Sequence, residues 1–283
     1  MKIAIASGKG GTGKTTVATN LAYFLKVNEN KNVTLLDCDV EEPNSHLFLK
    51  PDWHTTQSVS VPIPLVDRDK CTGCGKCAEI CQFNALACIK DQVLTFPELC
   101  HGCGGCVLVC PSGAVTAGER NIGWVQTGSG REITLIHGQL RVGEALSPPL
   151  IRAVKDAAPR AGITLLDCPP GTSCPVIQSV RGSDFVLLVT EPTPFGLNDL
   201  KLAVEMVREL QIPFAVGINR STIGDGSVRY YCGQENIPII LEIPNDREIA
   251  RAYSDGRLLL EVLPRYWDSF ARLAACLSEV IPC

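Results

Sequence analysis

Two short runs of cysteine with the same spacing limit what the middle of this chain can fold into. The runs hold eight of the 15 cysteines: Cys71, Cys74, Cys77 and Cys81, then Cys100, Cys103, Cys106 and Cys110. Adding 29 to each number of the first run gives the second run, and the same shift takes Leu86 to Val115. The two halves are therefore copies, and we expect a small repeated unit whose thiols bind metal.

The spacing of each run resembles that of the bacterial ferredoxins that hold two 4Fe-4S clusters. In that pattern each cluster takes three cysteines from one run and the fourth from the other. The resemblance assigns Cys71, Cys74, Cys77 and Cys110 to one cluster, and Cys81, Cys100, Cys103 and Cys106 to the other. Pro111 follows the last cysteine as the pattern expects, whereas Gln82 follows Cys81, so we expect a different turn beside that ligand.

Zinc is the alternative metal, because C-x2-C pairs also bind zinc tetrahedrally. Zinc ribbons separate their two C-x2-C pairs, whereas here a third and a fourth cysteine follow at once, so iron-sulfur clusters are preferred. Five glycines inside the runs also favour N–H groups turned toward cluster sulfides: Gly73, Gly75, Gly102, Gly104 and Gly105. His101 lies between two of the cysteines and is interpreted as a neighbour of a ligand.

The N-terminal segment predicts a phosphate-binding loop. Residues 2–6 read as a buried strand, a match to G-x4-G-K-[ST] follows, and a helix is expected over residues 16–26. Loop N–H groups and the helix N-terminus would hold phosphates, Lys14 would reach the outer ones, and the Thr15 hydroxyl would bind Mg²⁺. The predicted loop residues are Gly8, Lys9, Gly10, Gly11, Thr12, Gly13, Lys14, Thr15 and Thr16.

Acidic residues follow two further predicted strands. Asp37 and Asp39 come at the end of the strand expected at 33–36, and Asp167 follows the strand expected at 163–166. The carboxyl ends of parallel strands face the ligand crevice of an open α/β sheet. Loop capping would explain any single one of these aspartates, but three beside one phosphate loop favour a nucleotide site.

The whole pattern resembles the MinD/ParA/Mrp group of deviant-Walker P-loop ATPases, and more narrowly MinD-like ATPases with an inserted ferredoxin domain. The motifs that carry the likeness are Gly8-Lys9-Gly10-Gly11, Leu35-Leu36-Asp37-Cys38-Asp39, Asp167-Cys168-Pro169-Pro170-Gly171-Thr172 and Thr190-Glu191-Pro192-Thr193-Pro194-Phe195-Gly196. The likeness implies a dimer closed on ATP, in which Lys9 reaches the partner's phosphates. It also implies that Asp39 orients water, that Asp37, Asp39 and Asp167 support Mg²⁺, and that Asn219, with Arg220 beside it, binds adenine.

The expected fold is α/β, a mostly parallel Rossmann-like P-loop sheet covered by helices on both faces, with a small α+β ferredoxin-like insert. We place the ATPase in residues 1–61 and 119–283 and the insert in 62–118. Residues 59–64 read as a connector because of their prolines, and an edge hairpin is expected around Gly128-Ser129-Gly130. The helix expected at 265–280 has few cations, which favours packing on the sheet over binding to a membrane.

Charge and hydropathy exclude other classes. A formal net charge of -4 without a basic block argues against nucleic acid as a partner, and no stretch is long and apolar enough for stable membrane insertion. We therefore expect a cytoplasmic protein. The other cysteines are expected to be free thiols: Cys38, Cys88, Cys168, Cys174, Cys232, Cys276 and Cys283. Cys174, at the start of a predicted helix, leaves open a cluster shared across a dimer.

Three functions fit these features. The leading hypothesis is an ATPase, with hydrolysis slow or stimulated by a partner, whose dimer state governs electron transfer through two 4Fe-4S clusters to a redox protein. The dimer would form between identical chains or with a paralogue. The second is an ATPase that assembles iron-sulfur or other metallocofactors and delivers them to an acceptor protein. The third is a positional or regulatory MinD-like switch without redox turnover.

Overall fold

The computed structural model describes residues 1–280 and is built around one nine-stranded sheet. The strand order is β11-β10-β9-β1-β8-β2-β7-β6-β3. Neighbours from β11 to β7 are parallel, while β6 pairs antiparallel with β7 and β3. The strands are β1 (Lys2–Ala6), β2 (Val33–Asp37), β3 (Asp52–Val66), β6 (Val115–Gly130), β7 (Ile133–Leu140), β8 (Ile163–Asp167), β9 (Phe185–Thr190), β10 (Phe214–Ile218) and β11 (Ile239–Glu242). The predicted mostly parallel α/β sheet is confirmed.

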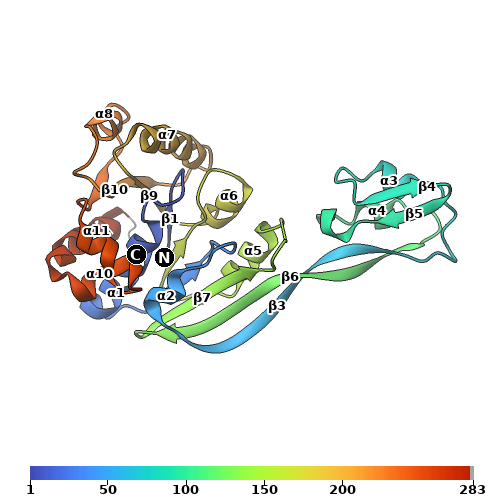
Figure 1. Ribbon diagram of the computed structural model, residues 1–283, viewed down its shortest axis with the longest axis horizontal. Coiled ribbons are helices and arrows are strands. Elements are labelled where there is room, and N and C mark those ends of the chain that lie inside the picture. The colour runs from blue at the N-terminus through green and yellow to red at the C-terminus, as the bar shows by residue number, and fades with distance from the viewer. Residues whose placement is uncertain (281–283) are drawn as a thin grey trace.

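Helices cover both faces of the parallel part (Figure 1). Side chains alternate along β1, so Ile3 and Ile5 join one apolar core while Ala4 and Ala6 join the other. The first core packs under α1, α10 and α11, and the second under α5 to α8. The bounds are α1 (Lys14–Glu29), α2 (Ser45–Leu49), α5 (Pro148–Asp156), α6 (Cys174–Val180), α7 (Pro194–Glu209), α8 (Ser227–Gln234), α9 (Arg247–Ser254), α10 (Leu259–Val262), η2 (Pro264–Tyr266) and α11 (Trp267–Val280).

The C-terminal helix α11 packs on the sheet, as the sequence predicts. Phe270, Leu273 and Leu277 are buried in the first core. Their helical spacing puts them on one face, and burying them removes apolar surface from water. Within residues 1–280 we find no helix with the length and apolarity that a membrane crossing requires.

A long two-stranded ribbon, formed by β3 and β6, leaves the sheet and carries a small unit at its far end (Figure 1). Pairing runs from Asp52 opposite Ser129 to Val66 opposite Val115, with two register shifts. Residues 59–64, read as a connector from the sequence, lie inside β3, in the part of the chain that leads from the sheet to the small unit. Pro62 and Pro64 fit there because β3 is an edge strand, which does not need every N–H for pairing.

The expected hairpin is confirmed by the antiparallel pairing of β6 with β7, but its turn lies later than Gly128-Ser129-Gly130. Gly128 and Gly130 lie within β6, and the chain turns at Arg131 and Glu132, whose φ values are 52° and 58°. Both glycines allow close packing of neighbouring backbone and do not form the turn. A Cβ on Gly128 would lie 2.6 Å from the Asp52 carbonyl oxygen, and one on Gly130 would lie 2.2 Å from the Leu49 carbonyl oxygen. Backbone contact therefore selects glycine in this strand.

Residues 67–114, which we call the cysteine unit, keep the repeat seen in the sequence. The unit contains α3 (Lys76–Glu79), β4 (Leu86–Ile89), β5 (Gln92–Thr95), η1 (Pro97–Leu99) and α4 (Gly105–Leu108). The shift of 29 residues that relates the cysteine runs also takes α3 onto α4 and the start of β4 onto the start of β6. Cys77, Leu86, Cys106 and Val115 form a small core of their own at this end of the ribbon.

Candidate functional site

The phosphate loop lies between β1 and α1, as predicted. Gly11 and Gly13 have φ values of 77° and 95°, a region that favours glycine. Gly8 is fixed by packing, since a Cβ there would lie 2.1 Å from the Asp199 carbonyl oxygen. Lys14 is buried, and its Nζ donates to the Ser7 hydroxyl at 3.0 Å. The sequence thus forms a loop whose backbone and lysine face one cavity.

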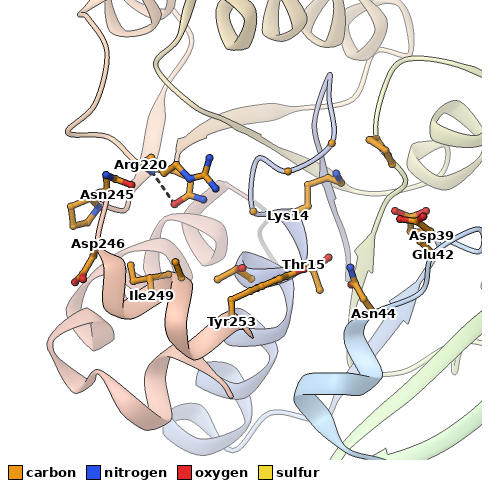
Figure 2. A pocket seen from close by; sticks show the side chains of 18 residues that line it. Lys14, Thr15, Asp39, Glu42, Asn44, Arg220, Asn245, Asp246, Ile249 and Tyr253 are labelled. Atoms are coloured by element: carbon orange, nitrogen blue, oxygen red, sulfur yellow. Dashed lines mark hydrogen bonds between the residues drawn. The ribbon is translucent and has the colours of Figure 1, made fainter. Parts of the chain in front are cut away.

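That cavity has a volume of about 460 Å³ and opens at the carboxyl ends of the parallel strands. Figure 2 shows Lys14 and Thr15 on one side of it, with Asp39 and Asn44 nearby. The opposite wall comes from the segment after β11 and from α9. The lining residues are Gly10, Gly11, Gly13, Lys14, Thr15, Thr16, Asp39, Glu42, Asn44, Pro170, Asn219, Arg220, Pro244, Asn245, Asp246, Ile249, Ala250 and Tyr253.

The three predicted aspartates lie at adjacent strand ends. Asp37 of β2 stands directly opposite Asp167 of β8, and Asp39 lines the cavity two residues later. Asp37 is fully buried, and its carboxylate accepts N–H groups from Asp39, Asn44 and Ser45 at 2.9–3.2 Å. These bonds fix the loop after β2, so Asp37 organises the backbone that presents Asp39. Its assignment to Mg²⁺ stays a prediction.

Burial sets the protonation of the other two acids. It raises the pKa of Asp39 to about 7, and the nearby Asp37 carboxylate adds to the rise. Burial likewise raises the pKa of Asp167 to about 8, again helped by Asp37. Within the described residues, Asp167 Oδ1 is a buried oxygen without a hydrogen-bond partner. A divalent cation beside Thr15 would satisfy that oxygen and favour the ionised form, so the donor set suits Mg²⁺.

Lys9 of the phosphate loop does not line the cavity. It forms an ion pair with Glu191, and the second oxygen of Glu191 accepts from Arg220 at 3.0 Å. The Glu191 side chain is nearly buried, whereas that of Lys9 is about a third exposed (29%). One carboxylate thus holds two cations, and one of them, Arg220, lines the cavity.

Asn219 lines the cavity, but its amide is already engaged. Nδ2 donates to the Thr12 carbonyl at 2.9 Å, and Oδ1 accepts the Arg220 N–H at 2.9 Å. A Cβ on Gly13 would lie 2.3 Å from Asn219 Nδ2, so the side chain is packed tightly against the phosphate loop. In this structure Asn219 braces the loop, and its contact with adenine stays a prediction.

Sequence reasoning missed the wall opposite Thr15. Pro244, Asn245 and Asp246 precede α9, which supplies Ile249 and Tyr253 to the cavity (Figure 2). Asp246 caps α9 by accepting the Glu248 N–H at 2.8 Å. Bonds from Tyr266 and then Arg265 lower the pKa of Asp246 to about 2. The available signal was the capping aspartate before an amphipathic segment, which predicts a helix start.

The cysteine unit brings four of its thiols around one hollow. Cys100, Cys103 and Cys106 of the second run line it together with Cys81 of the first. The Sγ of Cys81 accepts the Ala85 N–H at 3.3 Å, and that of Cys100 accepts the Gly102 N–H at 3.4 Å. Phe83 and His101 also line the hollow, and their rings stack with centroids 3.9 Å apart.

The thiols around this hollow do not converge on one point. Across residues 1–280, no group of three or more His, Cys, Asp or Glu side chains is gathered closely enough to hold a single metal ion. In a 4Fe-4S cube each cysteine binds a different iron, so its ligands stand apart around a space. Cys71, Cys74, Cys77 and Cys110 belong to the same unit, and their joint role stays a prediction.

The remaining cysteines divide by burial. Cys38, Cys168 and Cys232 are buried in the sheet region, as expected for thiols packed as small apolar side chains. Cys88 and Cys276 are partly exposed. Cys174 is exposed in the first turn of α6. Cys283 lies outside the described residues.

The description "CobQ/CobB/MinD/ParA nucleotide binding domain" belongs to a family model that matches residues 3–260. This chain is a member of that family. Membership makes it a nucleotide-binding P-loop ATPase of the MinD/ParA type, in agreement with the loop, the strand-end acids and the sheet order.

Relatives and solved structures agree with that membership. An uncharacterized protein of Methanocaldococcus jannaschii is 33% identical over 99% of this chain and 98% of its own length. The iron-sulfur cluster carrier protein of the same organism is 27% identical over 82% of this chain and 63% of its own length. The septum site-determining protein MinD of Pyrococcus horikoshii, solved with Mg-ADP, has a TM-score of 0.63 and 19% identity, covering 99% of this chain and 96% of that one. At 19% identity, the likeness to this MinD structure shows a shared fold alone.

Proposed function

We propose that this protein is an ATP-hydrolysing dimeric switch that carries two 4Fe-4S clusters and couples its nucleotide state to electron transfer. One observation carries the proposal: Cys81 joins Cys100, Cys103 and Cys106 around a single hollow in the same chain as a nucleotide site. A set of one thiol from the first run and three from the second is the set that the ferredoxin spacing requires.

The chain's own residues suit phosphoryl transfer, which depends mainly on positioning and on neutralising charge. Loop N–H groups and Lys14 hold the phosphates, and Thr15 with Asp167 would hold Mg²⁺, which supplies charge neutralisation when bound. Asp39 lines the cavity and orients water toward the outer phosphate. Lys9 leaves Glu191 and reaches the phosphates of the partner subunit, so hydrolysis depends on pairing of two chains.

The cysteine unit fits the clusters by its donors. The eight thiols come from two runs of four cysteines with the same spacing. Backbone N–H groups already donate to the sulfurs of Cys81 and Cys100, as such groups do to the negatively charged sulfur of a cluster. Bound clusters supply one-electron transfer. The ribbon of β3 and β6 carries the unit away from the sheet, where a redox protein can approach it (Figure 1).

Anaerobic purification followed by metal analysis and electron paramagnetic resonance tests this function. We expect about eight iron and eight sulfide per chain, and a reduced-cluster signal whose midpoint potential changes when ATP and Mg²⁺ are added. Zinc in place of iron, or potentials and electron-transfer rates that ignore ATP, would overturn the proposal.

Cluster delivery is the second candidate, because an iron-sulfur cluster carrier protein is among the relatives. A carrier must release its cluster, so its test is the transfer of iron and sulfide to an apo-acceptor. ATP-stimulated transfer without any change in cluster potential would favour delivery over electron transfer. Cys174→Ser is the informative variant, since this exposed thiol lies outside the cysteine unit. A shared delivery cluster would be lost in that variant.

A further inference from the structure

The ribbon that carries the cysteine unit is tied to the ATPase body by a buried ion pair that the nucleotide site does not use. Arg120 of β6 pairs with Glu144, which lies in the loop between β7 and α5. Their side chains are only 7% and 1% exposed. Removing two charges from water is costly unless each is well paired, so such a pair fixes the relative position of its two elements.

Arg120 also holds a proposed cluster ligand. Its Nη2 donates to the Cys100 carbonyl oxygen at 3.3 Å while Nη1 pairs with Glu144. The Cys100 loop is seated on the ribbon beside it, because a Cβ on Gly102 would lie 3.2 Å from both Cδ and the carbonyl oxygen of Pro62. One planar guanidinium therefore joins the body to the backbone of Cys100, which a lysine could not match in geometry.

Glu144 is positioned by its own loop. Its Oε1 accepts the Leu146 N–H at 3.0 Å, and its backbone N–H donates to the Arg141 carbonyl at 3.0 Å. The Arg141 N–H donates in turn to the Ile122 carbonyl of β6 at 2.9 Å. The loop over residues 141–147 directly follows β7 and is thus held against β6.

The end of β7 is attached to the segment after Asp39, which we call the nucleotide loop. The Leu140 N–H donates to the Val40 carbonyl at 2.8 Å, and Val40 directly follows Asp39, which lines the nucleotide cavity. Val40 is buried, and a Cβ on Gly138 would lie 2.6 Å from its Cγ1. A displacement of the segment after Asp39 is therefore passed to Leu140 by close packing and a hydrogen bond.

We infer that Arg120 is a positioning residue that couples the nucleotide loop to the Cys100 ligand loop through Glu144. This inference rests on the proposed function and names the residues through which nucleotide state reaches the clusters. The contacts run from Asp39 and Val40 to Leu140, then to Glu144, Arg120 and the Cys100 carbonyl. A second ion pair, Arg141 with Glu98 at 3.9 Å, joins the body directly to the cysteine unit, but both side chains are exposed and the pair is worth little.

The test compares the cluster-loaded protein with an Arg120→Met/Glu144→Gln double variant. Removing both charges together avoids leaving a carboxylate buried without a partner. Arg131→Met is the matched control, because Arg131 also pairs with a glutamate, Glu261, and donates to backbone carbonyls, but at the opposite end of the ribbon. The readouts are amide hydrogen exchange over residues 100–106 and cluster midpoint potential, each with and without a non-hydrolysable ATP analogue.

In the wild type and in the Arg131 variant, we expect the analogue to change the exchange rate of residues 100–106 by about fivefold or more. In the double variant, the rates with and without analogue should agree within about twofold, while iron content and nucleotide affinity stay at wild-type values. Arg120→Lys keeps the positive charge but lacks the planar guanidinium that can bond Glu144 and the Cys100 carbonyl together. This variant should also lose most of the change in exchange rate that the analogue causes.

A double variant that keeps the full nucleotide response would overturn the inference, and so would a wild type whose Cys100 loop does not respond. The two proposals fail in different ways. If the wild-type potential responds to nucleotide while the exchange of residues 100–106 does not, the proposed function stands and the Arg120 route is wrong. If neither responds, both fail.

Discussion

At the scale of single residues, the ion pair with Glu191 holds the Lys9 side chain within its own subunit. Glu191 neutralises Lys9 within one chain, together with Arg220. For Lys9 to act on a second chain, it has to exchange this carboxylate for phosphate, which carries more negative charge. In the proposed dimer, this exchange would link ATP binding to pairing of subunits through one side chain.

Lys9→Ala should leave ATP affinity within about threefold of wild type and lower hydrolysis by at least about tenfold, because charge stabilisation by such a residue acts in the transition state. Steady-state phosphate release and nucleotide titration measure the two effects. Glu191→Gln is the paired variant. It frees Lys9 and should keep or raise hydrolysis. A fall in both variants would mean that the ion pair itself is required.

The raised pKa values of Asp39 and Asp167, about 7 and about 8, predict a pH dependence for the metal-free protein. An aspartate whose pKa is higher in the folded than in the unfolded chain holds its proton more tightly when folded. Its contribution therefore favours folding at low pH and weakens it as the pH rises toward the folded pKa. We expect the Tm without Mg²⁺ to fall from about pH 6 to about pH 8.

Asp167→Asn removes the larger of these titrations, so its Tm should vary less over the same range. Differential scanning calorimetry in chelator measures both proteins. Added Mg²⁺ and nucleotide should restore wild-type stability above neutral pH, since a cation favours the ionised carboxylates. A variant with the same pH profile as wild type would show that Asp167 does not titrate there.

At the scale of elements, the β6–β7 turn carries local strain. Arg131 and Glu132 both adopt positive φ, which costs non-glycine residues about 1 kcal/mol each. Glu132→Gly should therefore stabilise the protein by roughly 0.5–1 kcal/mol, measured by denaturant unfolding. Glu132→Gln is the control for the exposed ion pair with Lys26, and it should change stability by less than about 0.5 kcal/mol.

At the scale of the whole molecule, the body and the cysteine unit have separate cores joined by one ribbon. Val66 and Val115 pair where the ribbon enters the unit, so an Asn-Gly turn can replace residues 67–114. We expect the shortened chain to fold and to bind nucleotide within about threefold of wild type, because the cavity takes no residue from the unit. It should bind no iron.

A full-length chain with all eight run cysteines changed to serine is the control for that deletion, since it also lacks thiol ligands but keeps the ribbon intact. Isothermal titration with nucleotide and iron analysis measure the three proteins. Loss of nucleotide binding in the shortened chain alone would show that the body needs the cysteine unit to fold.

Patterns that depend on neighbours in the chain were predictable. The loop from Gly8 to Thr15 has a local signature, and the strands of the parallel sheet follow from short apolar runs such as 185–190. The repeat of 29 residues in the sequence predicted two similar halves, and α3 and α4 are related by that same shift. Asn219 was predicted as a cavity residue, but its bonds to Thr12 and Arg220 were not foreseen.

The sequence by itself determined the family motifs, the parallel sheet and the repeated cysteine unit, because these are written in local spacing and hydrophobic period. Only the tertiary structure decided that residues 59–64 continue an edge strand and that α9 closes the nucleotide cavity. It alone brought Arg120 to Glu144 and Cys100. Such contacts join segments far apart in the chain, where packing and burial, rather than local propensity, set the lowest free energy.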